Sequence, residues 1–236
     1  MNKTQIYTAI REAMEAAKRG EDVTFLLNQL TEALVPDIRT EANKAAGAGK
    51  VEKIVKDILK VAGSNASENM HYTAIIDNKQ YCLDGYRLLE LNTPIDAPIF
   101  GEDPITRGGT WYDVKKIMPA NLDLVKVDNI PALEDLRMFN KVNKKYNPVA
   151  VMSVNSFNII VNAAWLQNAL DNFTDPVIQC IERPFDNRYN ISPVIITGKE
   201  GRLMLLPINN CKIFEVEPGL YCLDKHGAGL VRREAA

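Results

Sequence analysis

The amino-acid sequence predicts an α+β fold in which helices pack on antiparallel sheet. Apolar residues recur every three or four positions in the first third of the chain, as in amphipathic helices. Most later segments are short and strand-like and follow one another closely, as in an antiparallel sheet. With 236 residues, of which 46% are hydrophobic, the chain is long enough to bury a core without disulfides or a metal.

The composition excludes several classes of protein. A charged fraction of 25% beside 46% hydrophobic residues is not typical of disordered, collagen-like or coiled-coil chains. The net charge of -2 means that any contact with nucleic acid has to be local. The first twenty residues carry charges throughout and resemble neither a secretory signal nor a membrane anchor, so we expect no membrane association and a cytoplasmic location.

The sequence offers little for catalysis. Its four cysteines stand singly and its two histidines lie beside no natural nucleophile. Nucleotide-binding loops and hydrolase motifs are missing. The closest approach to a carboxylate site is Asp77 with Asp84, which turn geometry explains equally well. We therefore expect a protein that is not an enzyme and has no catalytic residue, no metal and no cofactor; an enzyme using these two aspartates is a weaker alternative.

The first elements are helical. Residues 1–49 predict two or three short helices, with Pro36 opening one of them and Gly47 and Gly49 ending it. The next helix covers residues 51–61 and is amphipathic. Its apolar side consists of Val51, Ile54, Val55, Ile58 and Leu59, and its opposite side carries Lys53, Lys56 and Lys60.

Strands follow. The segments HYTAIID and KQYCLDGYRLLELN, joined by Asp77 and Asn78, predict a β-hairpin. Residues 93–109 contain too many prolines and glycines for a regular element. A second basic helix is predicted over residues 130–146. Its buried face is expected to hold Ala132, Leu136, Phe139, Val142 and Tyr146, opposite Arg137, Lys141, Lys144 and Lys145.

The last third alternates strands with one helix. VAVMSV and SFNIIV predict strands, NAAWLQNALDNF a helix, and VIQCIERP, SPVIITG and RLMLLPI three further strands. A final hairpin, KIFEVEPGLYCLD, turns at Pro218 and Gly219.

Four segments carry a resemblance. They are LDGYRL from Leu83, WYDVKKIMP from Trp111, FNIIVNAAWLQNAL from Phe157 and MLLPI from Met204. In order and spacing they resemble the TDGxRL strand, the FPDYRRVLP linker, the FNxxYLxxAL helix and the VVMP strand of the bacterial DNA polymerase III beta subunit, the sliding clamp. The resemblance covers about residues 50–208.

The resemblance implies an abridged clamp. Residues 1–49 would be an added helical segment, 50–119 a partial clamp-like unit, 120–208 a C-terminal clamp-like unit, and 209–236 a hairpin and tail. Three positions depart from the family pattern, with Leu83 for threonine, Lys116 for arginine and Leu206 for methionine.

In the family, the first, second and fourth segments form a hydrophobic pocket that binds linear peptides of polymerases and other replication proteins. An apolar wall with one cation at its rim would suit such a peptide. The same segments could also be ordinary core strands. By position, the pocket would consist of Leu83, Gly85, Tyr86, Arg87, Leu88, Tyr112, Lys116, Ile117, Met204 and Leu206.

The resemblance also implies contact with the backbone of double-stranded DNA, by the seven basic residues of the two helices. A lysine-rich helix face can equally be plain solvated surface. We therefore expect a DNA-associated processivity or scaffold factor that captures peptide motifs, with a homo-oligomer as an open alternative to a single copy. The alternative is a clamp-fold interaction module, encoded by a phage or mobile element, that does not bind DNA.

Overall fold

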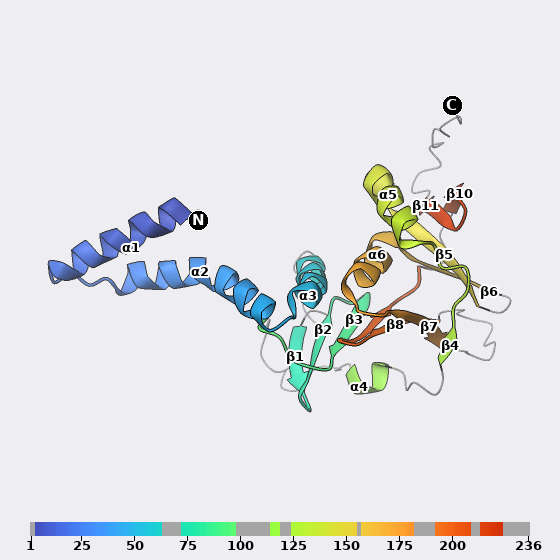
Figure 1. Ribbon diagram of the computed structural model, residues 1–236, viewed down its shortest axis with the longest axis horizontal. Coiled ribbons are helices and arrows are strands. Elements are labelled where there is room, and N and C mark those ends of the chain that lie inside the picture. Colours follow the sequence, from blue (N-terminus) through green and yellow to red (C-terminus); the bar gives the residue numbers. More distant parts are fainter. Residues whose placement is uncertain are drawn as a thin grey trace. The chain divides into compact units, whose positions relative to one another are not determined.

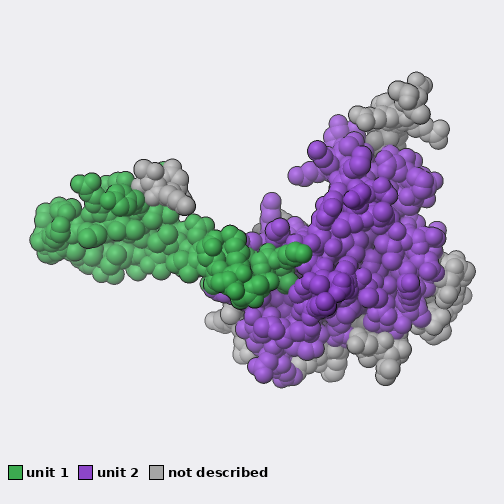
Figure 2. All heavy atoms as spheres, viewed as in Figure 1, with its two compact units in different colours: residues 1–52 green, residues 53–236 purple. Residues whose placement is uncertain are grey.

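The computed structural model describes residues 3–62, 72–97, 114–118, 124–154, 157–181, 192–208 and 213–223. The chain divides into two compact units, Met1–Glu52 and Lys53–Ala236 (Figure 2). The two units are described separately below.

The first unit consists mainly of a helical hairpin, in which α1 (Lys3–Lys18) runs antiparallel to α2 (Thr24–Ala45) (Figure 1). The prediction that Pro36 opens a helix is wrong, because Pro36 lies inside α2. The Thr40 hydroxyl donates a hydrogen bond of 2.9 Å to the Pro36 carbonyl. The helix ends where Gly47 takes a positive φ of 75°, as predicted for this glycine.

Helix α3 (Gly49–Ala62) has the two faces that its sequence predicts. Lys53, Lys56 and Lys60 are exposed. Glu52, on the other hand, is buried, and its carboxylate accepts a hydrogen bond of 3.1 Å from the Thr40 hydroxyl. The five predicted apolar residues are all buried, namely Val51, Ile54, Val55, Ile58 and Leu59.

The second unit contains a seven-stranded antiparallel sheet with the order β1-β2-β3-β9-β8-β7-β4. The predicted hairpin is confirmed as β1 and β2, with Asp77 and Asn78 at the turn in positive φ of 50° and 60°. Its second predicted segment, KQYCLDGYRLLELN, is not one strand but divides into β2 and β3, which pair with each other. The strands are β1 (Tyr72–Ile76), β2 (Lys79–Leu83), β3 (Arg87–Leu91), β4 (Leu124–Lys126), β7 (Val177–Ile181), β8 (Val194–Gly198) and β9 (Gly201–Leu205).

The centre of this sheet joins two similar halves. Helix α3 precedes the meander β1-β2-β3, and helix α6 (Ala163–Asn172) precedes the meander β7-β8-β9. The last strands of the two meanders pair with each other, with Leu89 opposite Leu203. At the end of that pairing a Cβ on Gly201 would lie 2.0 Å from the Glu90 carbonyl oxygen. The backbones of the two halves therefore meet too closely there for any residue but glycine.

A second, four-stranded sheet has the order β10-β11-β5-β6 and is also antiparallel. Its strands are β5 (Pro148–Val154), β6 (Phe157–Asn162), β10 (Ile213–Glu217) and β11 (Leu220–Leu223), so the predicted C-terminal hairpin is confirmed. Helices α5 (Leu133–Asn143) and α6 pack on each other and on this sheet.

The predicted buried face of the second basic helix is only partly correct. Leu136 and Phe139 are buried, but Val142 is 59% exposed and Tyr146 36% exposed. Val142 lies inside α5, about 120° around the helix from Leu136, so the α-helical period itself turns it away from the core. Tyr146 belongs to the 3-10 helix η4 (Lys144–Tyr146), which follows the end of α5 at Asn143 and whose different period changes the direction of its side chain. Ala132 lies before the helix and is exposed.

The structure thus has an α+β fold in which helices accompany two antiparallel sheets, as the sequence predicts at this level. Within the described ranges, no helix is both long enough and apolar enough to cross a lipid bilayer.

Candidate functional site

The turn between β2 and β3 is organised by the carboxylate of Asp84. Its Oδ1 accepts hydrogen bonds from the backbone N–H groups of Tyr86, at 2.9 Å, and Arg87, at 2.7 Å. Gly85, between Asp84 and Tyr86, has a positive φ of 85°, a conformation that glycine adopts without strain. The Asp-Gly pair of the LDGYRL segment therefore fixes where Arg87 starts its strand.

Arg87 is the centre of the site and is only 1% exposed. Its Nε donates to Oδ2 of Asp84 at 2.7 Å. Its Nη1 donates to the carboxylate of Asp57 on α3, and Nη2 donates to the backbone carbonyl of the same residue at 3.1 Å. The guanidinium carbon lies 4.6 Å from the ring centroid of Trp165 on α6. We call Arg87, Asp84, Asp57 and Trp165 the Arg87 cluster.

The surroundings hold the Arg87 cluster in place. The Asn162 side chain caps α6 and accepts hydrogen bonds from the N–H groups of Ala164 and Trp165. Asn168, one turn after Trp165, donates to the Asp57 carboxylate at 3.3 Å. The ring of Tyr86, a residue that is 51% exposed, lies 5.9 Å from that of Trp165. One buried cation thus connects α3, the start of β3 and the first turn of α6.

On the face of the sheet opposite the Arg87 cluster, side chains form an apolar cluster under the short helix α4 (Val114–Ile117). Strand pairing aligns Leu83 with Leu88, Leu88 with Met204, and Met204 with Ile195, which makes a continuous row. We call this group the α4 cluster. Its buried members are Tyr81, Leu83, Leu88, Val114, Met118, Ile195 and Met204, and Ile117 and Leu206 are among the partly buried residues packed against it.

The structure therefore brings together five of the predicted pocket residues and separates others from them. The α4 cluster contains or contacts Leu83, Leu88, Ile117, Met204 and Leu206, which come from all three predicted segments.

Arg87 does not lie at the rim of that apolar group. Side chains alternate between the two faces of a strand, so Arg87 and Leu88 point to opposite sides of the sheet. Arg87 is buried against helices, and Gly85 and Tyr86 belong to the turn. Tyr112 and the side chain of Lys116 lie outside the described part of the structure.

A second buried ion cluster lies on the α4 side of the sheet, around Glu90. Its carboxylate accepts hydrogen bonds from Lys79 at 3.0 Å, from Tyr81 at 3.0 Å and from Arg202 at 2.9 Å. Burial alone would raise the pKa of Glu90, but the bond from Lys79 and the charge and bonds of Arg202 hold it below its usual value. Burial and the neighbouring Glu90 charge raise the pKa of Tyr81 to about 12.

The predicted DNA-contacting residues lie on helices that flank α6. Helix α5 contacts α6, with Asn140 donating to Gln167 at 2.8 Å, and α3 contacts α6 through Asp57 and Asn168. Figure 1 shows α6 between α3 and α5. The single charged residue in the α6 sequence is Asp171. All seven predicted basic residues are exposed, which are Lys53, Lys56, Lys60, Arg137, Lys141, Lys144 and Lys145.

Arg137 and Lys145 are among the basic side chains that are engaged. Arg137 forms an ion pair with Asp171, to which its Nε donates at 2.9 Å. The Lys145 ammonium lies 4.8 Å from the centroid of the Tyr146 ring. Glu134 and Asp135 in the first turn of α5 add acidic charge to the same helix. The helix layer is therefore basic, but less strongly than its lysines alone would indicate.

Sequence reasoning missed three residues of the site, Asp57, Trp165 and Asn168. Asp57 is the one acidic residue between Lys53 and Lys60 on the basic helix α3, and this irregularity could have indicated that it pairs with a cation inside the protein. Trp165 and Asn168 gave no comparable signal, because they meet Arg87 and Asp57 only after folding.

A scan against models of protein families found none that matches this chain, and a search of curated proteins found no match either. The described residues contain no group of three or more histidine, cysteine, aspartate or glutamate side chains that could bind a metal ion. The class supported by the structure is thus an α+β protein with two antiparallel sheets and a basic layer of three helices.

Proposed function

We propose that this chain is a sliding-clamp-like, non-enzymatic protein that associates with double-stranded DNA and captures short peptide motifs of replication proteins. The observation that carries the proposal is the helix layer α3-α6-α5. Two lysine-bearing helices flank a helix with a single charge, in a molecule whose net charge is -2. Such a layer suits contact with phosphates without reading bases.

The apolar side of the proposal rests on the α4 cluster. Leucine, isoleucine and methionine side chains from three separate segments meet there, as a site for an apolar peptide requires. Leu83 and Met204 are 7% and 5% exposed, so a peptide would have to displace α4 to reach them. Peptide capture is therefore coupled to movement of α4 in this proposal.

Salt-dependent DNA binding tests the proposal. The chain would be titrated with a fluorescent duplex of random sequence at about 50 and 200 mM salt. Each phosphate contact contributes about 0.9 to the slope of log K against log salt. The double variant Lys141→Glu/Lys144→Glu should weaken binding and reduce that slope by about 2.

Lys199→Glu serves as the control, since Lys199 is exposed on the β8–β9 turn, where it pairs with Asp175 from the segment before β7. It should leave both affinity and slope near those of the unchanged chain. Absence of duplex binding at 50 mM salt, or an unchanged slope in the double variant, would overturn the DNA part of the proposal.

A second candidate is an interaction module that does not bind DNA. The observation that favours it is the apolar surface of the first unit, where Tyr7 is 69%, Phe25 70% and Ile38 61% exposed. A chain that fails to bind duplex but forms a defined complex through these helices would have this function instead.

A further inference from the structure

The helical hairpin of the first unit has more apolar surface than its own packing uses. Within the described residues of α1 and α2, the buried hydrophobic side chains are Ala13, Ala16 and Leu30. A two-helix hairpin with so small a core is marginally stable in water. The hairpin is therefore expected to pack against something further.

The surplus surface on α1 is a regular stripe. Helix α1 contacts α2, and its least exposed row consists of Ile6 and Ala9, which are half-buried, with Ala13 and Ala16, which are 3% and 6% exposed. A second set at the same alternating spacing of three and four consists of Tyr7, Ile10, Met14 and Ala17. The first three of these are 69%, 39% and 57% exposed. Such spacing is typical of a helix that packs on two neighbours.

Helix α2 has a matching stripe. Leu30, which is 6% exposed, lies on its α1-facing side, whereas Leu27, Leu34 and Ile38 form a second row. Leu27 is 50% and Ile38 61% exposed. At about 100° per residue, the second row is rotated from the first in the same sense on both helices, by about 100° on α1 and about 60° on α2. Because the helices are antiparallel, rotations in the same sense bring both rows to one face of the hairpin.

We propose that this face, defined by Tyr7, Ile10, Met14, Leu27 and Ile38, is a dimer interface that packs against the same face of a second copy. The product is a four-helix bundle with two-fold symmetry, in which each copy contributes α1 and α2. This inference does not depend on the proposed DNA association.

The charge of the hairpin favours a second copy over nucleic acid or an anionic membrane. Residues 1–52 contain seven basic and eight acidic side chains, a net charge of -1. Two such units approach each other without net repulsion, and they offer no basic patch for phosphates or lipid headgroups. A near-neutral apolar face with a mixed polar border fits a protein partner.

The α1 stripe is also complementary to itself. If two copies of α1 lie antiparallel with Ile10 opposite Met14, Tyr7 lies opposite Ala17, so that a large side chain faces a small one. Both pairs occur twice by symmetry.

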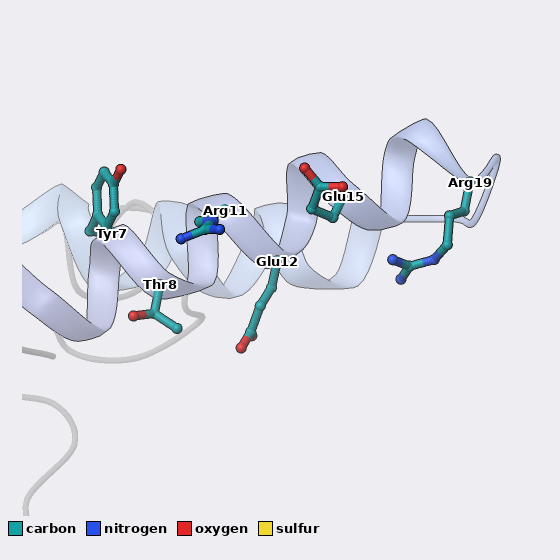
Figure 3. Close-up of a pocket in the computed structure, with 6 residues that line it drawn as sticks. All are labelled: Tyr7, Thr8, Arg11, Glu12, Glu15 and Arg19. Carbon is teal, nitrogen blue, oxygen red and sulfur yellow. The ribbon is translucent and has the colours of Figure 1, made fainter.

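Charges beside the α1 stripe fit the same register. A shallow groove along α1 is lined by side chains that include Tyr7, Arg11, Glu15 and Arg19 (Figure 3). In the proposed register, Arg11 of one copy is offset by only about 3 Å along the axis from Glu15 of the other.

Sedimentation equilibrium of the full chain at about 1 to 100 μM tests the proposal. The unchanged chain should form a dimer. Ile10→Asp and Met14→Lys should each raise the dissociation constant by at least about tenfold, because each places charges opposite apolar side chains. Phe25→Asp is the control, since Phe25 is 70% exposed but lies outside the stripe, and it should leave the constant unchanged.

Mixing the two variants separates an interface from a folding defect. A mixed dimer of Ile10→Asp and Met14→Lys pairs aspartate with lysine at one position and keeps Met14 opposite Ile10 at the other. The mixture should therefore associate more tightly than either variant alone. A monomeric unchanged chain at 100 μM, single variants that dimerise normally, or a mixture no tighter than its components would each overturn the proposal.

Discussion

Replacing Arg87 with methionine removes the guanidinium but keeps an unbranched apolar side chain, and it should strongly destabilise the second unit. Arg87 is 1% exposed, and the side chain of its partner Asp84 is 0% exposed. Removing the cation leaves a buried carboxylate without its counter-charge, which typically costs about 3 to 5 kcal/mol. The Asp57 end adds little, since that side chain is 39% exposed and its ion pair is worth about 0 to 1 kcal/mol.

Urea unfolding followed by tryptophan fluorescence measures the effect, since Trp165 lies against the guanidinium. The free energy of unfolding should fall by about 3 to 5 kcal/mol, a large share of the 5 to 15 kcal/mol typical of a domain. Lys53→Met is a matched control on the exposed side of α3 and should change it by no more than about 0.5 kcal/mol.

A double variant tests whether the loss of stability comes from the uncompensated charge of Asp84. Asp84→Asn removes the charge but keeps an oxygen that can accept the N–H groups of Tyr86 and Arg87. Added to Arg87→Met, it should recover about 1 to 3 kcal/mol. The reasoning is refuted if Arg87→Met costs less than about 1 kcal/mol, or if the double variant is less stable than Arg87→Met alone.

Two further predictions concern the large sheet. The pKa of Tyr81 is about 12 in the folded chain and about 10 in an unfolded one. The contribution of Tyr81 to stability should therefore be intact below pH 10 and lost between pH 10 and 12. Alkaline unfolding of the Tyr81→Phe variant should lack this loss, and an equally steep decline of stability in the variant would contradict the prediction. Gly201→Ala should destabilise the chain by at least about 2 kcal/mol in urea unfolding, because its Cβ would lie 2.0 Å from the Glu90 carbonyl oxygen. The control is Gly49→Ala, whose Cβ would lie 3.3 Å from Cγ of the flexible Lys44 side chain, and it should leave stability nearly unchanged.

Local sequence patterns predicted those elements whose structure is decided locally. The α3 faces follow from helical periodicity, and the turn at Asp77 and Asn78 follows from residues that tolerate positive φ. The face of α5 was predicted less well. Val142 lies about 120° around the helix from Leu136, too far to share its buried face. Tyr146 follows the change from α-helix to 3-10 helix after Asn143, and composition does not reveal where that change occurs.

The site was predictable in its apolar part only. Alternation along β3 and pairing with β9 bring Leu88 and Met204 together, and both belong to motifs visible in the sequence. The partners of Arg87 were not predictable, because Asp57 and Trp165 lie 30 residues before it and 78 residues after it, and no local pattern connects them.

The pairing of β3 with β9 also bears on the order of folding. Each meander can form from contacts within a few dozen residues, but the two meanders join across a separation of 114 residues between Leu89 and Leu203. Closing so long a loop costs conformational entropy, and only the completed pairing of β3 with β9 offsets that cost. We therefore expect the middle of the sheet to be its last part to assemble, with two half-sheets exposing unpaired edges to other chains until it does.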